Sequence, residues 1–259
     1  MRRSSAEGVI LKIIVIGESD LLVRILTPGY GPMMLVARRA LKSVKRFGGR
    51  LLLFNVLRFD YSRRKRGDIA YMENAAIMES FTNIFTDMEN MCRVALLAEV
   101  VMSTWGEGDP AHNVFSFFID YLRRMDAGGV SEDRDILDAF RLLDILGHRP
   151  MLDVCACCGG ELGNSKMYSV NEGGTVCRKC AGEESDRLRA RGGTMPCEVS
   201  PAVRRTLEKA YGMEPRFLDR VKFSSLSRPE ARNLWLSHVR AIMGRTPKSN
   251  SGIEKFKSA

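Results

Sequence analysis

Four cysteines in the middle of the chain have the residue type and the spacing of a metal site. They form two C-x2-C pairs separated by 18 residues: Cys155 with Cys158, and Cys177 with Cys180. A C-x2-C turn brings two sulfurs onto one metal ion, and two such turns at this spacing are typical of tetrahedral zinc. Four thiolates fill the coordination sphere and leave no position for an activated water. The pattern therefore predicts one structural Zn2+ per chain.

Other interpretations of these cysteines stay open. Cys157 is an alternative ligand in place of Cys155 or Cys158, and His148 is a more remote one. The cysteines could also be redox-active or free thiols of a core, although neither explains two pairs at this spacing. The total of seven cysteines is odd and does not suggest a disulfide framework, so we expect a reducing, cytoplasmic compartment.

Motifs for catalysis are missing from the sequence. It has no G-x-x-x-x-G-K-[ST], H-E-x-x-H or G-x-S-x-G segment, and no H-x-E partner for a zinc deaminase. No run of 18 apolar residues is present to span a membrane. We therefore predict a protein that is not an enzyme, has no small-molecule substrate and does not enter the membrane.

Basic side chains gather in the first 80 residues, which carry 15 Lys and Arg against 7 Asp and Glu, while the other 179 residues carry 25 against 24. This asymmetry suggests a polyanion partner, nucleic acid first, although a solvated basic surface would give the same charge. The candidate DNA-binding residues form two clusters: Arg38, Arg39, Lys42, Lys45, Arg46 and Arg50, then Arg63, Arg64, Lys65 and Arg66.

Four aromatic residues lie near these clusters: Phe47, Phe54, Phe59 and Tyr61. Barrels of the OB type bind single strands with a basic groove and with aromatic rings on which bases stack. These rings could supply such stacking, but we expect at least half of them to belong to the core.

Five segments rich in β-branched and aliphatic residues must position the basic clusters. They cover 9–16, 21–26, 33–37, 51–61 and 69–78, with Gly, Pro, Ser and Asp in the turns. Five strands with short turns favour a five-stranded OB-fold β-barrel.

Apolar residues then recur at helical spacing within 88–102, 114–125 and 136–146. Two later helix starts are predicted, one with Ser200 as N-cap and one with Ser227 and Glu230 as a capping box. The fold class is thus α+β. We expect the OB-fold domain over 1–80, an α-helical domain over 81–243 that carries a four-cysteine zinc ribbon at about 151–184, and a disordered basic tail over 244–259.

Several segments resemble the RecO family of bacterial DNA repair and recombination proteins. Those similar to its first strands and turns are 8–11, 17–23 and 27–31; 42–51 is similar to its basic segment, and 152–159 and 173–177 to its zinc-ribbon variant. This chain departs from the family pattern by its additional Cys157 and by the more apolar stretch 51–54.

The resemblance implies a protein of the nucleoid that binds single- and double-stranded DNA and anneals complementary strands. Implied partners are RecR and, in some members, the acidic tail of single-stranded DNA-binding protein. Together they help to load the RecA recombinase on gapped DNA. Two alternatives remain: an adaptor that binds proteins and touches DNA non-specifically, and an RNA-associated zinc-ribbon protein with an OB fold.

Overall fold

The computed structural model describes residues 2–65, 69–191 and 195–250. It divides the chain into two compact units, Met1–Gly129 with Ser249–Ala259, and Val130–Lys248. The first unit contains the segment 1–80 that we expected to form the OB-fold domain, and it continues through two helices. Among the described residues, no helix combines the length and the apolar character needed to cross a membrane.

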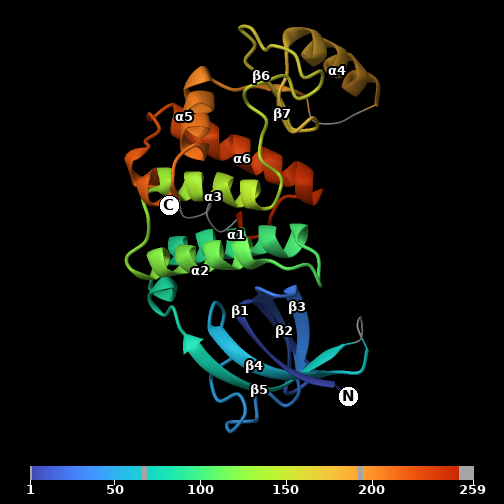
Figure 1. Cartoon of the computed structure of the whole chain (residues 1–259), viewed down its shortest axis with the longest axis vertical. Coiled ribbons are helices and arrows are strands. Elements are labelled where there is room, and N and C mark those ends of the chain that lie inside the picture. The colour runs from blue at the N-terminus through green and yellow to red at the C-terminus, as the bar shows by residue number, and fades with distance from the viewer. Residues whose placement is uncertain (1, 66–68, 192–194, 251–259) are drawn as a thin grey trace. The chain divides into compact units, whose positions relative to one another are not determined.

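Five strands of the first unit close into a barrel in the order β1-β2-β3-β5-β4, which confirms the predicted OB-type fold (Figure 1). The long β1 closes it, because its first half pairs with β4 and its second half with β2. The strands are β1 (Arg2–Ile16), β2 (Asp20–Thr27), β3 (Gly31–Ala37), β4 (Val56–Arg63) and β5 (Ala70–Glu79).

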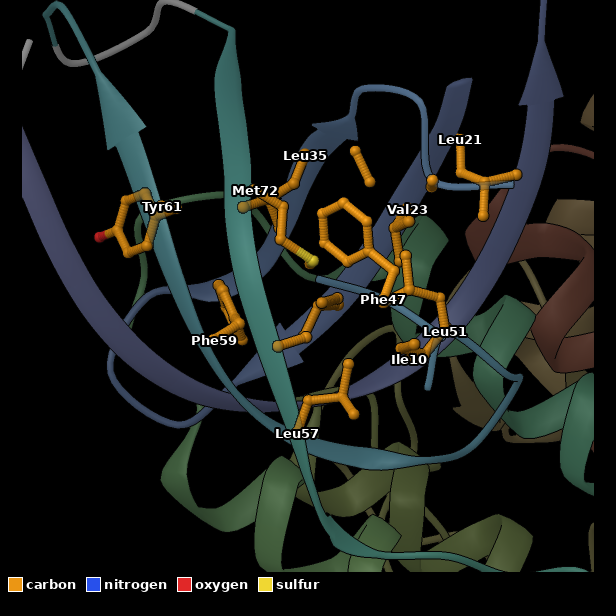
Figure 2. Packing of buried hydrophobic residues seen from close by; sticks show 14 of the residues in the cluster. Ile10, Leu21, Val23, Leu35, Phe47, Leu51, Leu57, Phe59, Tyr61 and Met72 are labelled. Atoms are coloured by element: carbon orange, nitrogen blue, oxygen red, sulfur yellow. The ribbon is translucent and has the colours of Figure 1, made fainter. Parts of the chain in front are cut away.

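Alternation along the strands builds the barrel core. In β2, Leu21, Val23 and Ile25 are buried, whereas Leu22 and Arg24 between them are only partly buried, as a period of two requires. Figure 2 shows the inward-pointing side chains of several strands meeting in the interior. Phe47 also enters this core, although it comes from the loop between β3 and β4.

The predicted strand 51–61 is wrong in its first half, since β4 begins only at Val56. The preceding residues form a turn, in which the Asn55 amide donates to the Leu52 carbonyl and Phe54 has a φ of 67°. Phe54 packs on Phe85 at a ring-centroid distance of 6.0 Å. Leu51 is buried in the barrel core and Leu53 packs partly against it, whereas Leu52 is 54% exposed. Strand propensity does not distinguish such a turn from a paired strand.

Two of the three helices predicted from apolar periodicity follow the barrel in the first unit. They are α1 (Met88–Thr104) and α2 (His112–Asp126), preceded by the short η1 (Asn83–Thr86). Asp87 caps α1 by accepting from the Glu89 and Asn90 amides. Both helices contact β1, and Arg123 of α2 binds Glu79 at the end of β5 at 2.8 Å.

The second unit joins further helices to the cysteine module. Its elements are α3 (Glu132–Ile145), β6 (Met167–Ser169), β7 (Gly174–Thr175), α4 (Arg178–Arg191), β8 (Cys197–Glu198), α5 (Pro201–Tyr211), η2 (Pro215–Arg220) and α6 (Ser227–Met243). The α3 helix contacts both α5 and α6. Its buried Arg134 binds Asp138 at 3.0 Å and Asp219 at 2.9 Å.

One predicted helix cap is confirmed and the other is wrong. The Ser200 hydroxyl accepts from the Val203 amide at the start of α5. No side-chain cap is formed at α6, because Ser227 bonds to Ser224 instead. The Glu230 carboxylate accepts from the Ser200 amide and hydroxyl, so it completes the cap of α5 and joins two helices.

The predicted disordered tail 244–259 falls partly within the described residues. Its Ser249 donates two hydrogen bonds, from the amide and the hydroxyl, to Glu99 of α1 at 3.0 Å each. Residues 251–259 lie outside the described part of the chain.

Candidate nucleic-acid interface and metal centre

The four predicted metal ligands meet in the second unit. The sulfurs of Cys155, Cys158, Cys177 and Cys180 all lie within 4.8 Å of one another. Four sulfurs about 2.3 Å from one tetrahedral ion would be about 3.8 Å apart, so the cluster has the size of a metal site. These four residues can therefore hold a metal ion, and thiolate sulfur is a ligand that suits zinc.

Backbone hydrogen bonds shape both halves of the cluster. Two hydrogen bonds close the turn that begins at Cys155. The Cys155 amide donates to the Gly160 carbonyl, and the Gly159 amide donates to the Cys155 carbonyl. The Ala156 amide donates to Thr175 of β7 at 2.8 Å, which ties this turn to the strand that precedes Cys177. Cys180 follows in the first turn of α4. The local fold thus brings together pairs that are distant in sequence.

The cluster also stabilises a thiolate. Burial acts to raise the pKa of Cys155, but hydrogen bonds from the backbone amides of Cys177, Cys158 and Cys157 lower it to about 6. The Cys177 amide lies 3.3 Å from the Cys155 sulfur. In contrast, a hydrogen bond to the Cys177 sulfur and burial raise the pKa of Cys180. A deprotonated thiol is the form that binds a metal.

The two alternative ligands do not belong to this group. Cys157 is exposed, and its sulfur is not among the four that converge in the described part of the chain. The backbone carbonyl of His148 accepts from His238 Nε2 at 3.0 Å, and its ring is likewise not part of the cluster.

A buried histidine anchors the cysteine module to α6, and no sequence motif pointed to it. His238 Nδ1 lies 2.9 Å from the Tyr168 hydroxyl of β6. Burial lowers the pKa of His238, and the hydrogen bond to the His148 carbonyl opposes this shift. His238 is therefore a neutral structural residue that joins three segments.

Residues 38–50 form the first part of the connection from β3 to β4 and are called the basic loop. Arg46 Nη2 donates to the Arg38 carbonyl at 2.7 Å, and its Nε donates to the Ser43 hydroxyl at 3.2 Å. Arg50 Nη1 donates to the Lys45 carbonyl at 3.2 Å. Two of the predicted DNA-binding arginines thus hold the shape of the loop itself.

Other cations of the basic loop point to solvent. The side chains of Arg39, Lys42 and Lys45 are exposed, and none of them has an ionic partner among the described residues. The Arg39 backbone is fixed by its amide, which donates to Asp20 Oδ1 at 2.8 Å, and has a φ of 53°. These three positive charges thus have no described ionic partner, and the Arg39 backbone lies beside the turn between β1 and β2.

The second basic cluster lies at the hairpin between β4 and β5. Arg63 is paired with Glu107 at 2.9 Å. Arg64 and Lys65 are exposed and, together with Tyr30, line a cavity of about 450 Å3. Arg66 lies outside the described residues. The described residues of the two clusters therefore lie on different connections of the barrel, one between β3 and β4 and the other between β4 and β5.

The expectation that at least half of the four aromatic residues belong to the core is confirmed, and none of the four rings is available for base stacking. Phe47, Phe54, Phe59 and Tyr61 are each at most 8% exposed, so their rings belong to the interior. A different ring, Tyr71 of β5, is partly exposed. The Arg38 guanidinium lies over this ring, with its Cζ atom 4.2 Å from the ring centroid. The alternation of Tyr71 with buried Ala70 and Met72 was the signal that could have revealed it.

Known proteins match the chain over both units. A family model described as "Recombination protein O N terminal" matches residues 1–81, and one described as "Recombination protein O C terminal" matches residues 86–251.

Relatives named DNA repair protein RecO cover most of the chain. One from Syntrophus aciditrophicus is 27% identical over 252 residues, which are 96% of this chain and 95% of that protein. One from Roseiflexus is 30% identical over 246 residues, 94% of this chain and 82% of that protein. One from Anaeromyxobacter dehalogenans is 31% identical over 184 residues, which are 70% of this chain and 72% of that protein. With both family models and these relatives in agreement, the chain belongs to the RecO family of DNA repair proteins.

Proposed function

We propose that this protein binds single- and double-stranded DNA and promotes the annealing of complementary strands during repair and recombination. The observation that carries the proposal is the group of unpaired cations Arg39, Lys42 and Lys45, exposed on one loop of an OB-type barrel. Unpaired Lys and Arg bind phosphates and release counterions, which is the main source of sequence-independent affinity. Hydrogen bonds from Arg46 and Arg50 to backbone carbonyls hold the loop that carries these charges.

Annealing follows from the same electrostatics. Two complementary strands repel each other until cations neutralise part of their phosphate charge. The protein would act stoichiometrically, without ATP and without catalytic residues. Phosphate contacts carry no base information, so any complementary pair of strands is a substrate.

We assign a structural role to the cysteine cluster, with one Zn2+ held by Cys155, Cys158, Cys177 and Cys180. The close approach of four sulfurs supports this role, and the Cys177 amide bonded to the Cys155 sulfur supports it further. Four thiolate ligands close the coordination sphere, so the ion would stabilise the module and would not activate water. Zinc binding then adds to the folding free energy of this region.

Family membership supports three further parts of the proposal. The protein would act on the nucleoid in the cytoplasm, with RecR as a partner, and would contact the acidic tail of single-stranded DNA-binding protein. In this way it would help to load the recombinase on gapped DNA.

A strand-annealing assay tests the proposed function. Purified protein is mixed with two complementary oligonucleotides, one labelled with a donor dye and the other with an acceptor, with and without ATP. We expect the protein to speed annealing without ATP and in proportion to its concentration. RNA strands of the same sequence form a second arm, because a preference for RNA would favour the RNA-associated alternative. Failure to bind or anneal DNA at low salt would contradict the proposal.

A further inference from the structure

Two aliphatic side chains of the basic loop are exposed to solvent. Val44 is 81% exposed and Leu41 is 58% exposed. Ala40 and Phe47 belong to the barrel core, so they anchor the segment 41–46 at both of its ends. The exposed aliphatic side chains between these anchors have no role in the core. We call Leu41 and Val44 the apolar tip of the basic loop.

Backbone contacts fix the position of the apolar tip. The Leu41 amide donates at 3.1 Å to a backbone carbonyl in the turn between β1 and β2. The amides of Phe47 and Gly48 both donate to the Ser43 carbonyl, at 3.1 and 3.2 Å, and close a turn. A Cβ atom at Gly48 would lie 2.4 Å from the Val44 carbonyl oxygen, so this close approach requires glycine. The tip is therefore presented by a closed turn.

Free cations alternate with the apolar tip along the chain. Arg39, Lys42 and Lys45 are exposed, and the described part of the chain gives them no ionic partner. Lys42 directly follows Leu41, and Lys45 directly follows Val44. A single exposed aliphatic residue is ordinary on a protein surface, but two of them interleaved with unpaired cations are a specific combination. It matches a ligand that encloses an apolar interior within a surface of negative charge.

Double-helical DNA is the ligand that fits this combination best. Proteins that kink a duplex insert aliphatic side chains between two base pairs from the minor groove, and their cations bind the adjacent phosphates. The loop has no exposed ring on which the bases of a single strand could stack, because Phe47, its one aromatic residue, is 1% exposed. An anionic membrane has related chemistry, but the chain belongs to a family of DNA repair proteins.

The polar groups of the loop are used to hold its shape. Arg46 Nε donates to the Ser43 hydroxyl at 3.2 Å, and both Arg46 and Arg50 donate to backbone carbonyls. The segment 38–50 contains no Asn, Gln, Asp or Glu that could read a base edge. Insertion by the tip would therefore depend on how easily a base step unstacks, and pyrimidine–purine steps such as TA unstack most easily.

We propose that the apolar tip enters the minor groove of double-stranded DNA and inserts between two base pairs. The inserted side chains leave water and replace part of the stacking that the base pairs give up, so the duplex kinks at this step. Arg39, Lys42 and Lys45 bind the flanking phosphates. The inference rests on the proposed function and deepens it, because it assigns a contact that only a duplex can make to two named side chains.

The test uses the full chain and a short duplex that has 2-aminopurine at a central TA step and a donor and an acceptor dye at its ends. Wild type should raise the 2-aminopurine fluorescence, because the base loses a stacking neighbour, and should raise energy transfer, because the duplex bends. The tip variant, Leu41→Ser with Val44→Thr, keeps every charge and should abolish both signals. It should weaken duplex binding about tenfold and leave oligo(dT) binding unchanged.

Two further variants complete the design. Gly48→Ala removes no apolar atom but crowds the Val44 carbonyl, so it should reduce both signals. The matched control is Leu226→Ser with Ile77→Thr, which makes similar changes at positions outside the loop that are 85% and 47% exposed. It should behave like wild type. Circular dichroism and thermal melting check the fold of each variant.

The outcomes separate this inference from the proposed function. If wild type binds the duplex without raising either signal, or if the tip variant binds and signals like wild type, insertion is refuted while DNA binding stands. Vesicles of phosphatidylglycerol form a further arm. If the tip variant loses vesicle binding but keeps both duplex signals, the tip is a membrane contact and the inference is overturned. If wild type binds neither the duplex nor oligo(dT), the proposed function fails and this inference fails with it.

Discussion

The Arg46 guanidinium donates to the Arg38 carbonyl at 2.7 Å, so one arginine of the basic loop holds the backbone of another. Neither this bond nor the bond from Arg50 to the Lys45 carbonyl uses a carboxylate. The loop is therefore organised without cancelling its charge. Its cations divide into those that build the loop and those that remain free for a ligand.

Replacing the free cations should change the salt dependence of DNA binding. A triple variant with Gln at Arg39, Lys42 and Lys45 removes charges that have no described partner. Each phosphate contact on a single strand contributes about −0.7 to the slope of log affinity against log salt. The slope should therefore flatten by about two units if all three contact phosphate. A salt titration of oligonucleotide binding measures it.

The matched control for this triple variant uses three exposed cations of the second unit, Arg205, Lys209 and Lys222. Their replacement by Gln changes the net charge equally and should leave the slope unchanged. Equal flattening by the two triple variants would mean that net charge, and not the basic loop, sets the affinity.

Arg46→Gln should loosen the basic loop. It removes the hydrogen bonds to the Arg38 carbonyl and to the Ser43 hydroxyl, at a cost of about 1 kcal/mol in the free energy of unfolding. Urea denaturation gives the stability, and limited proteolysis detects cleavage within 38–50. Arg39→Gln is the control, because the described bond of Arg39 comes from its backbone amide. Equal protease resistance of both variants would argue against the structural role of Arg46.

Cys177→Ser should abolish metal binding and lower the melting temperature of the protein, because it removes one of four converging sulfurs. Cys157→Ser should retain one Zn2+ per chain, since its exposed sulfur lies outside that group in the described residues. Elemental analysis of the two purified variants measures this directly. Loss of zinc from the Cys157 variant would show that the ligand assignment is wrong.

Acid should destabilise the second unit through His238. Burial lowers the pKa of His238 below its ordinary value of 6.5, so the unfolded chain takes up this proton at a higher pH than the folded one. The contribution to the free energy of unfolding is therefore constant above pH 6.5 and falls below it, by at most about 1.4 kcal/mol per pH unit.

Urea denaturation at pH 7.5 and pH 5.5, compared between wild type and His238→Gln, isolates this residue. Glutamine retains hydrogen-bonding capacity but does not titrate, so the variant should lose less stability on acidification than wild type. An identical loss in both proteins would assign the acid sensitivity to other groups.

The strands and helices could largely be predicted from the sequence because their patterns are local. Alternation in β2 and the Ser200-Pro201 helix start each depend on a few neighbouring residues. The turn at Phe54 could not be predicted, because its conformation depends on packing against Phe85, which is distant in sequence. The hydrogen bond between Glu230 and Ser200 was missed for the same reason. The Glu230 carboxylate binds Ser200, which is distant in sequence, and does not form the predicted local cap with Ser227.

The candidate sites likewise contain some residues that the sequence predicts and others that only the structure shows. The cysteine pairs were recognisable because metal geometry restricts their spacing. The neighbours Lys12 and Arg24 belong to different strands, and only the register between β1 and β2 shows that they lie side by side. Tyr71 was likewise overlooked because its relation to Arg38 crosses from one strand to another.

The seam between β3 and β5 has a consequence for local opening of the barrel. These strands are parallel, and among the residues that the structure describes they pair only at Leu35 with Ala70 and at Val36 with Tyr71, whereas β1 and β4 pair from Arg2 to Val9. A seam with fewer hydrogen bonds opens at a lower free energy, so its amide protons should exchange with deuterium before those of the β1–β4 seam. A DNA strand bound across β3 and β5 would span this seam and act as a clamp on it. Slower exchange at Val36 and Tyr71 in the presence of oligonucleotide would report that clamp, and the amides of β4 provide an internal reference.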